Sequence, residues 1–147
     1  MKTIQLTKGK KALVDDEDFD RVNALSWYFN GRYAARKDSN GTMLLHRFIM
    51  NTPSDMVTDH INGNRLDNRK DNLRICTQSQ NRANSRISIT NTSGYKGVCY
   101  DKRLKKYRAY IRKDGIMHNL GLFVTAKEAH LRYEEEAEKL FGEYKHK

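Results

Sequence analysis

The 147-residue chain has no long apolar run. A membrane-spanning helix needs ~20 consecutive apolar residues, and no window of this sequence approaches that length. The opening stretch, "MKTIQLTKGKK", also lacks the apolar centre of ~7–15 residues that a secretory signal contains. We therefore expect a protein that stays in the cytoplasm and has no membrane partner.

Cysteine is also scarce. Cys76 and Cys99 are the two cysteines of the chain, and they form no Cys-x-x-Cys pair. Structural zinc sites and disulfide frameworks both need more closely patterned cysteines, so the sequence predicts no zinc. We expect both thiols to be small apolar residues of the interior.

The hydrophobic fraction of 37% limits the core to one ordinary domain or two small ones. What is abundant is positive charge, with a formal net charge of +10 and a pI near 9.7. Residues 94–113 carry eight basic side chains against Asp101 alone, whereas residues 126–147 have a net charge of −1. Positive charge gathered in one segment is typical of a surface that follows phosphates, so we expect a nucleic acid partner.

Residues 1–45 are predicted to be a β-rich extension that contacts DNA. "TIQL", "KALV" and "WYFNGRYAAR" have fragments of two-residue periodicity, "DDEDFDRVNAL" can open a helix, and "DSNGT" can form a hairpin turn. Residues 46–86 are predicted to hold a strand at 57–61, a polar loop, the strand "LRICT" and a helix opening near Thr77. Residues 87–93, rich in Ser, Thr and Asn, are predicted to be a linker.

Residues 94–147 are predicted to form a three-stranded antiparallel sheet packed on one helix. "GYKGVCYD", "KKYRAYIRKDG" and "MHNLGLFVT" alternate as strands do, and Thr125 and Glu128 have the spacing of a capping box. Apolar residues then recur at spacings of three and four, from Ala126 to Tyr144. The fold class expected for the whole chain is therefore α+β.

The second predicted strand has one strongly basic face. Lys106, Arg108, Tyr110 and Arg112 alternate with Tyr107, Ala109 and Ile111, so the first set points away from the helix. Such a face can lie in a groove of a duplex, although an ordinary solvated sheet face has the same pattern. We predict that DNA is contacted by residues of the first and second predicted strands: Lys96, Tyr100, Lys106, Arg108, Tyr110 and Arg112.

The central segment holds the residues that suit catalysis. Asp59 and His60 are adjacent, Asn72 follows twelve residues after His60, and Asn81 nine residues later. Neighbours on a strand face opposite sides, so Asp59 and His60 can flank one reacting phosphate. Asp59 and Asn81 offer hard oxygen ligands suited to Mg²⁺, and His60 can deprotonate a water as a neutral general base.

Two stretches resemble known families. "LHRFIM", "VTDHINGNRLDNRKDNLRICT" and "QNRANS" closely resemble the HNH endonucleases of the ββα-metal superfamily, specifically the phage and intron-associated homing type. Residues 94–143 resemble the APETALA-type DNA-binding domain of plant ethylene-response factors, which also occurs fused to such nucleases. The two resemblances cover about two thirds of the chain.

The HNH resemblance assigns a role to each central residue. It implies that Asp59 and Asn81 bind one divalent metal ion, Mg²⁺ or alternatively Mn²⁺. It implies that His60 is the general base and that Asn72 bonds the loop and orients that base. Asn81 stands where many members have His, which leaves a weaker, neutral ligand.

Several neighbouring residues have more ordinary interpretations. We expect Asp67 and Asp71 to cap turns. His46 matches the "LHR" stretch of the family and is interpreted as structural, with a phosphate contact as the alternative. Basic side chains are expected to give the nuclease unit a positive, phosphate-contacting surface: Arg65, Arg69, Arg74, Arg82 and Arg86.

The sequence thus predicts a site-specific, homing-type endonuclease that cuts double-stranded DNA and leaves 5′-phosphate and 3′-hydroxyl ends. A monomer is favoured and would nick, whereas a double-strand break would need a dimer or sequential cuts. A DNA-binding regulator with an inactive nuclease unit is the first alternative, and a basic RNA-binding protein the second.

Overall fold

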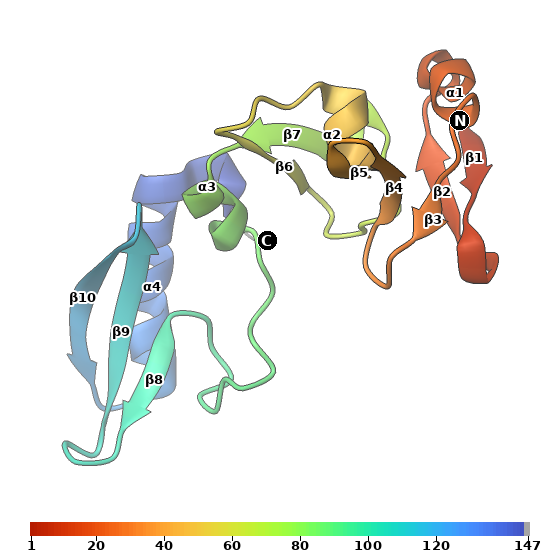
Figure 1. Ribbon diagram of the computed structural model, residues 1–147. Coiled ribbons are helices and arrows are strands. Elements are labelled where there is room, and N and C mark those ends of the chain that lie inside the picture. Colours follow the sequence, from red (N-terminus) through yellow and green to blue (C-terminus); the bar gives the residue numbers. More distant parts are fainter. Residues whose placement is uncertain (146–147) are drawn as a thin grey trace. The chain divides into compact units, whose positions relative to one another are not determined.

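The computed structural model describes residues 1–145, which form two compact units that divide after Thr77 (Figure 1). Small antiparallel sheets and a C-terminal helix packed on a sheet confirm the α+β class. No helix among the described residues is long and apolar enough to cross a membrane.

The first unit contains three small antiparallel sheets, β1–β2, β3–β4–β5 and β6–β7. Its elements in chain order are β1 (Lys2–Gln5), the 3₁₀ helix η1 (Thr7–Gly9), β2 (Lys11–Val14), α1 (Asp16–Asn23), β3 (Tyr28–Phe29), β4 (Ala34–Asp38), β5 (Gly41–Leu44), α2 (Leu45–Met50), β6 (Val57–His60), the 3₁₀ helix η2 (Lys70–Asn72) and β7 (Leu73–Cys76).

Local sequence accounts for several of these elements. The first turn of α1 carries Asp16, Glu17 and Asp18, whose negative charges suit the positive end of a helix dipole. The predicted hairpin turn joins β4 to β5, where Asp38 pairs with Gly41. Helix α2, over "LHRFIM", had no counterpart among the expected elements.

One hydrophobic core joins the N-terminal residues to the rest of the first unit. Trp27 is buried, as its aromatic character suggests, and its indole N–H donates to the Val22 carbonyl at 2.9 Å. The buried residues of this core come from both sides of residue 45: Ile4, Leu6, Ala12, Val14, Val22, Trp27, Ala34, Leu45, Ile49 and Leu73. Residues 1–45 therefore share a core with the residues that follow, and are not a separate arm.

The second unit has the predicted sheet and helix. It contains α3 (Gln78–Ala83), β8 (Val98–Asp101), β9 (Lys106–Lys113), β10 (Ile116–Phe123), α4 (Ala126–Phe141) and the 3₁₀ helix η3 (Gly142–Tyr144). The sheet is antiparallel with β9 at its centre, and α4 packs against it (Figure 1). The capping box is present, because the Thr125 hydroxyl accepts from the Glu128 amide at 3.2 Å and the Glu128 carboxylate accepts from the Thr125 amide at 3.1 Å.

The predicted apolar stripe of α4 packs on the sheet. Ala129, Tyr133, Ala137 and Phe141 are buried, and they meet Ala109 and Ile111 of β9. Cys76 is buried as expected, but Cys99 is exposed. The interpretation of Cys99 as an interior residue was wrong, because Cys99 lies opposite Arg108 on the face of the sheet that α4 does not cover.

Candidate active site

Asp59 and His60 end strand β6. They pair with Arg74 and Leu73 of β7, and both side chains are buried, at 7% and 5% exposure. Consecutive residues of a strand point to opposite faces, so the two side chains leave β6 in different directions. The strand therefore presents an acid on one side and an imidazole on the other, as the sequence pattern predicted.

Asp59 is joined to the strand opposite by an ion pair. The Arg74 guanidinium donates from Nε at 3.2 Å and from Nη2 at 3.0 Å to Oδ2 of Asp59. Arg74 was expected on the positive surface, but its side chain is only 14% exposed. A cation that binds Asp59 must therefore compete with an internal positive charge.

His60 lies in a cluster of rings. The ring of His46, on α2, meets the His60 ring edge-on with centroids 4.9 Å apart, and Tyr33 stacks on His60 at 6.1 Å. Burial lowers the pKa of His60, so the imidazole is neutral at pH 7. Burial also lowers the pKa of His46 to about 3, which supports the structural interpretation of His46.

The His60 ring is oriented by Asn68. The amide oxygen of Asn68 lies 3.3 Å from Nε2 of His60, and Asn68 is 1% exposed. An amide oxygen only accepts hydrogen bonds, so this contact suits the neutral tautomer that has its proton on Nε2 and its lone pair on Nδ1. Asn72, which was expected to orient the base, makes different contacts.

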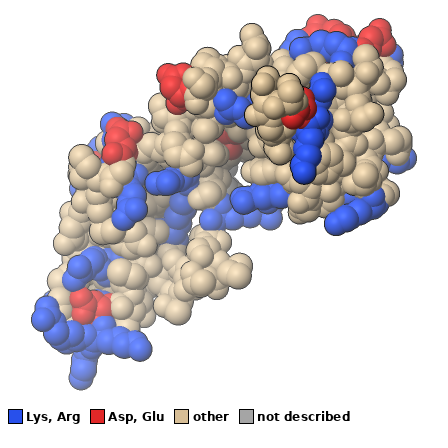
Figure 2. Space-filling view, viewed as in Figure 1, with Lys and Arg blue, Asp and Glu red and all other residues tan. Residues whose placement is uncertain are grey.

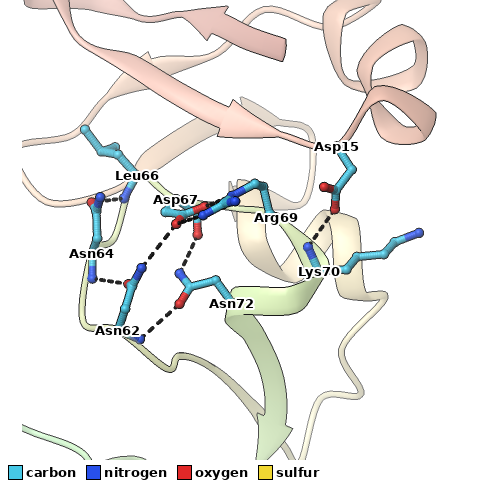
Figure 3. A network of polar contacts seen from close by, with 8 residues as sticks. All are labelled: Asp15, Asn62, Asn64, Leu66, Asp67, Arg69, Lys70 and Asn72. Carbon is cyan, nitrogen blue, oxygen red and sulfur yellow. Dashed lines mark hydrogen bonds and ion pairs between the residues drawn. The ribbon is translucent and has the colours of Figure 1, made fainter. Parts of the chain in front are cut away.

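Asn72 holds the loop after β6 together (Figure 3). Its side-chain N–H donates to the main-chain carbonyl of Asp67 at 2.8 Å, and its side-chain oxygen accepts from the main-chain N–H of Asn62 at 3.0 Å. Asn62 in turn donates to the Asp67 carboxylate at 3.1 Å. Asn72 therefore bonds the loop in this structure, and the asparagine that contacts the His60 ring is Asn68.

The loop is also fastened to the N-terminal residues. The Asn68 amide donates to the Leu13 carbonyl at 2.9 Å, and the Leu13 amide to the Leu66 carbonyl at 2.8 Å. The Asp15 carboxylate accepts from the Lys70 amide at 2.8 Å (Figure 3). Strand β2 therefore fixes the backbone of the residue that contacts His60.

Arg69 is occupied within this loop. Its guanidinium forms a two-point ion pair with the buried Asp67 carboxylate, at 2.8 and 2.7 Å. This contact holds the pKa of Asp67 below its usual value. The expected phosphate contact of Arg69 would have to share or replace Asp67, whereas Arg65 is exposed and lies 5.5 Å from the Tyr33 ring centroid.

Asn81 lies on α3, in the second unit, and is half-buried. Its predicted partnership with Asp59 at one metal ion remains a prediction. Among residues 1–145, no three His, Cys, Asp or Glu side chains gather as a metal-binding group. The proposed pair, the Asp59 carboxylate and the Asn81 amide oxygen, has one such side chain and does not meet this definition of a metal-binding group.

The outer face of the second unit's sheet has the predicted basic residues. Lys106 and Arg112 are exposed, and Arg108 pairs with Asp101 at 2.9 Å. Tyr100 differs, because it lies opposite Tyr107 with ring centroids 5.0 Å apart, on the helix side of the sheet. The turn between β8 and β9 adds further basic side chains, which Figure 2 shows at the end of the sheet: Lys102, Arg103 and Lys105.

Other predicted DNA contacts surround a cavity of about 430 Å³ in the second unit. Arg82, in the last turn of α3, and Arg86, three residues after the helix ends, line this cavity. Tyr110 and Arg112 of β9 line it as well. Lys96 also lines the cavity, but its ammonium donates to main-chain carbonyls at the end of α3. A phosphate contact by Lys96 would have to replace these bonds, and its role in DNA binding stays a prediction.

A strand-loop-strand segment whose first strand ends in a buried acid and a neutral imidazole is typical of a metal-assisted nuclease. The family of HNH endonucleases matches residues 51–83. The chain is 34% identical over 143 residues to an uncharacterized HNH endonuclease of Acanthamoeba polyphaga mimivirus, covering 93% of this chain and 74% of that protein. The chain therefore belongs to the HNH endonuclease family, which confirms the predicted family.

A second relative is Protein 3.8 of Escherichia phage T7. It is 36% identical over 67 residues, which are 46% of this chain and 55% of that protein. No solved structure matches the chain significantly. These matches do not establish the resemblance of residues 94–143 to ethylene-response factors, which remains a prediction.

Proposed function

We propose that the protein is a homing-type, site-specific endonuclease that hydrolyses phosphodiester bonds of double-stranded DNA. The observation that carries this proposal is the state of His60. Its ring is buried, neutral and held by Asn68 at Nε2, so Nδ1 is the nitrogen that can accept a proton. Asp59 precedes it on the same strand and points to the opposite face.

Asp59 and Asn81 would hold one divalent metal ion. Their carboxylate and amide oxygens are hard donors that fit Mg²⁺, and Mn²⁺ accepts the same ligands. The Arg74 ion pair already balances the charge of Asp59, so the site would bind metal weakly until DNA phosphate adds its own oxygens. When bound, the ion would stabilise negative charge on the phosphate and on the leaving oxygen.

His60 would take a proton from the attacking water at Nδ1. Attack of that water on phosphorus, with departure of the 3′-oxygen, leaves a 5′-phosphate and a 3′-hydroxyl. Arg65 would help to hold the phosphate here, since its side chain is exposed and lies 5.5 Å from the centroid of the Tyr33 ring, which stacks on His60. Asn72 keeps the loop closed, so that Asn68 retains its contact with the base.

The second unit would bind the duplex in the manner of an ethylene-response-factor domain. Its contacts would come from the uncovered face of the sheet and from the arginines beside the cavity: Lys106, Arg108, Tyr110, Arg112, Arg82 and Arg86. Arg108 already has a carboxylate partner, so we expect it to position Asp101 and the β8–β9 turn as well as to face DNA.

Cleavage of a duplex that carries the recognition sequence tests the proposal. The protein is incubated with DNA and Mg²⁺ or Mn²⁺, and the ends are mapped chemically. We expect wild-type protein to cut and His60→Ala to bind the same DNA while losing about 10²–10⁴-fold in rate. Equal cutting by both proteins would refute the role of His60.

A DNA-binding regulator with an inactive nuclease unit is the second candidate. The Asp59–Arg74 ion pair favours it, because it neutralises the one acidic metal ligand. Specific binding without metal-dependent cleavage by the wild-type protein would support this candidate and refute the first.

A further inference from the structure

Helix α3 has little stability of its own. It spans six residues, Gln78–Ala83, and isolated helices shorter than ~12 residues are marginal in water. The last carbonyls of any helix also lack partners within the helix. The position of α3, and with it the position of Asn81, must therefore be set by contacts from outside the helix.

Lys96 supplies donors to the C-terminal end of α3. Its ammonium lies 3.2 Å from the Arg82 carbonyl, 2.5 Å from the Ala83 carbonyl and 2.5 Å from the Ser85 carbonyl. An ammonium group has three N–H donors, and these three carbonyls use all of them. A phosphate contact by Lys96 would have to break this cap.

The backbone that carries Lys96 is itself fixed. The next residue, Gly97, accepts a hydrogen bond from the Tyr110 amide at 2.8 Å, which ties it to β9. Gly97 has φ +70°, and a Cβ at this position would lie 2.1 Å from the Tyr133 ring. The main chain next to Lys96 is therefore bonded to β9 and packed against Tyr133 of α4.

Two further contacts hold α3 in the second unit. The Ser79 hydroxyl accepts from the Asp114 amide, in the turn between β9 and β10, at 3.0 Å. Ala83 is buried in a cluster with Ile111, Tyr133 and further residues of α4. The helix is thus held near its start, by Ser79, and at its end, by Lys96 and Ala83.

We infer that Lys96 is a positioning residue for Asn81, acting by fastening α3 to the sheet of the second unit. This inference rests on the proposed function, in which Asn81 is a metal ligand. It makes the sheet that would bind DNA a structural support of the helix that would bind metal. Loss of the cap should then weaken metal use without weakening DNA binding.

Lys96→Met tests the inference, because methionine keeps an unbranched side chain but has no N–H donors. We expect the Mg²⁺ concentration for half-maximal cleavage to rise about tenfold, as for the loss of several hydrogen bonds to one helix end. Duplex affinity in metal-free buffer should stay within about twofold of wild type, since phosphate contacts are kept. Amide hydrogen exchange of residues 82–84 should accelerate in metal-free protein while β9 stays protected.

Lys106→Met is the matched control. Lys106 is exposed on β9 and has the same side chain, so this variant should lose duplex affinity and keep both the Mg²⁺ dependence and the protection of α3. If Lys96→Met behaves like Lys106→Met, Lys96 is a phosphate contact and the inference is wrong.

Ser79→Ala provides the second variant in case Lys96→Met does not fold. It removes a second polar contact of α3 and should raise exchange at residues 80–83 with a smaller rise in the Mg²⁺ requirement. Unchanged exchange and unchanged Mg²⁺ dependence would overturn the inference. If wild-type protein cuts with no metal, the proposed function fails, while hydrogen exchange still reports on the contact between Lys96 and α3.

Discussion

Replacing Asn72 with alanine should destabilise the first unit by about 2–3 kcal/mol. The change removes the bond to the Asp67 carbonyl, which is buried, and the bond to the Asn62 amide, which is partly buried. An orphaned buried acceptor costs about 1–3 kcal/mol, and a lost partly buried bond about 0.5–1.5 kcal/mol. Because the same loop carries Asn68, cleavage should fall even at temperatures where the variant is folded.

Urea denaturation followed by circular dichroism measures this loss. Asn64→Ala is the control, because its side chain accepts from the Leu66 amide in an exposed part of the same loop, and its removal should cost less than about 0.5 kcal/mol. If Asn72→Ala is as stable as Asn64→Ala and cleavage is nevertheless lost, Asn72 acts in the chemistry, and the interpretation of Asn72 as a loop-bonding residue is refuted.

Three further predictions follow from the structure. With His60 as the proposed general base, cleavage would need its neutral form. Burial lowers the pKa of His60 from the ordinary value near 6.5, so kcat/KM should fall as pH drops through a midpoint below 6.5, and a midpoint above 7 would contradict this. Arg74→Met leaves Asp59 buried without this guanidinium, so metal-free protein should lose about 3 kcal/mol and regain part of it in Mg²⁺, which thermal melts with and without the ion would show. Gly97→Ala should lower the free energy of unfolding of the second unit by about 3 kcal/mol, because the added Cβ meets the Tyr133 ring. Gly115→Ala is the control, because its added Cβ has no atom within 4 Å, so it should cost about 1 kcal/mol for its positive φ alone. Equal losses of unfolding free energy in urea titrations would exclude the clash.

Elements governed by near neighbours in sequence could be predicted. The capping box at Thr125 and Glu128 joins residues three apart, and the hairpin turn before β5 is equally local. The alternation of β9 correctly divides its two faces, because side chains of any strand alternate. The strand predicted at 57–61 is also present, as β6, and ends one residue earlier, at His60.

Contacts between distant residues could not be predicted in this way. Asp67–Asn68 and Asp71–Asn72 are the same dipeptide four residues apart, and sequence alone does not say which asparagine reaches His60. The Leu13 carbonyl, which accepts from the main-chain amide of Asn68, fixes Asn68 as the residue that contacts His60. Lys96 likewise lies in a basic segment, where a phosphate contact is the natural expectation. Its bonds to three main-chain carbonyls at the end of α3 form only because that helix packs against the sheet in the folded chain.

The bridge between β2 and the loop after β6 limits how this nuclease can have been assembled. The recognisable HNH segment, residues 51–83, does not contain Leu13, Val14 or Trp27, yet the buried side of β7 and the backbone of Asn68 depend on the N-terminal core. Transplanted into another protein, the segment would lack the surface against which its loop closes. The HNH segment alone is therefore not a unit that can be moved between proteins, because its loop needs the N-terminal core.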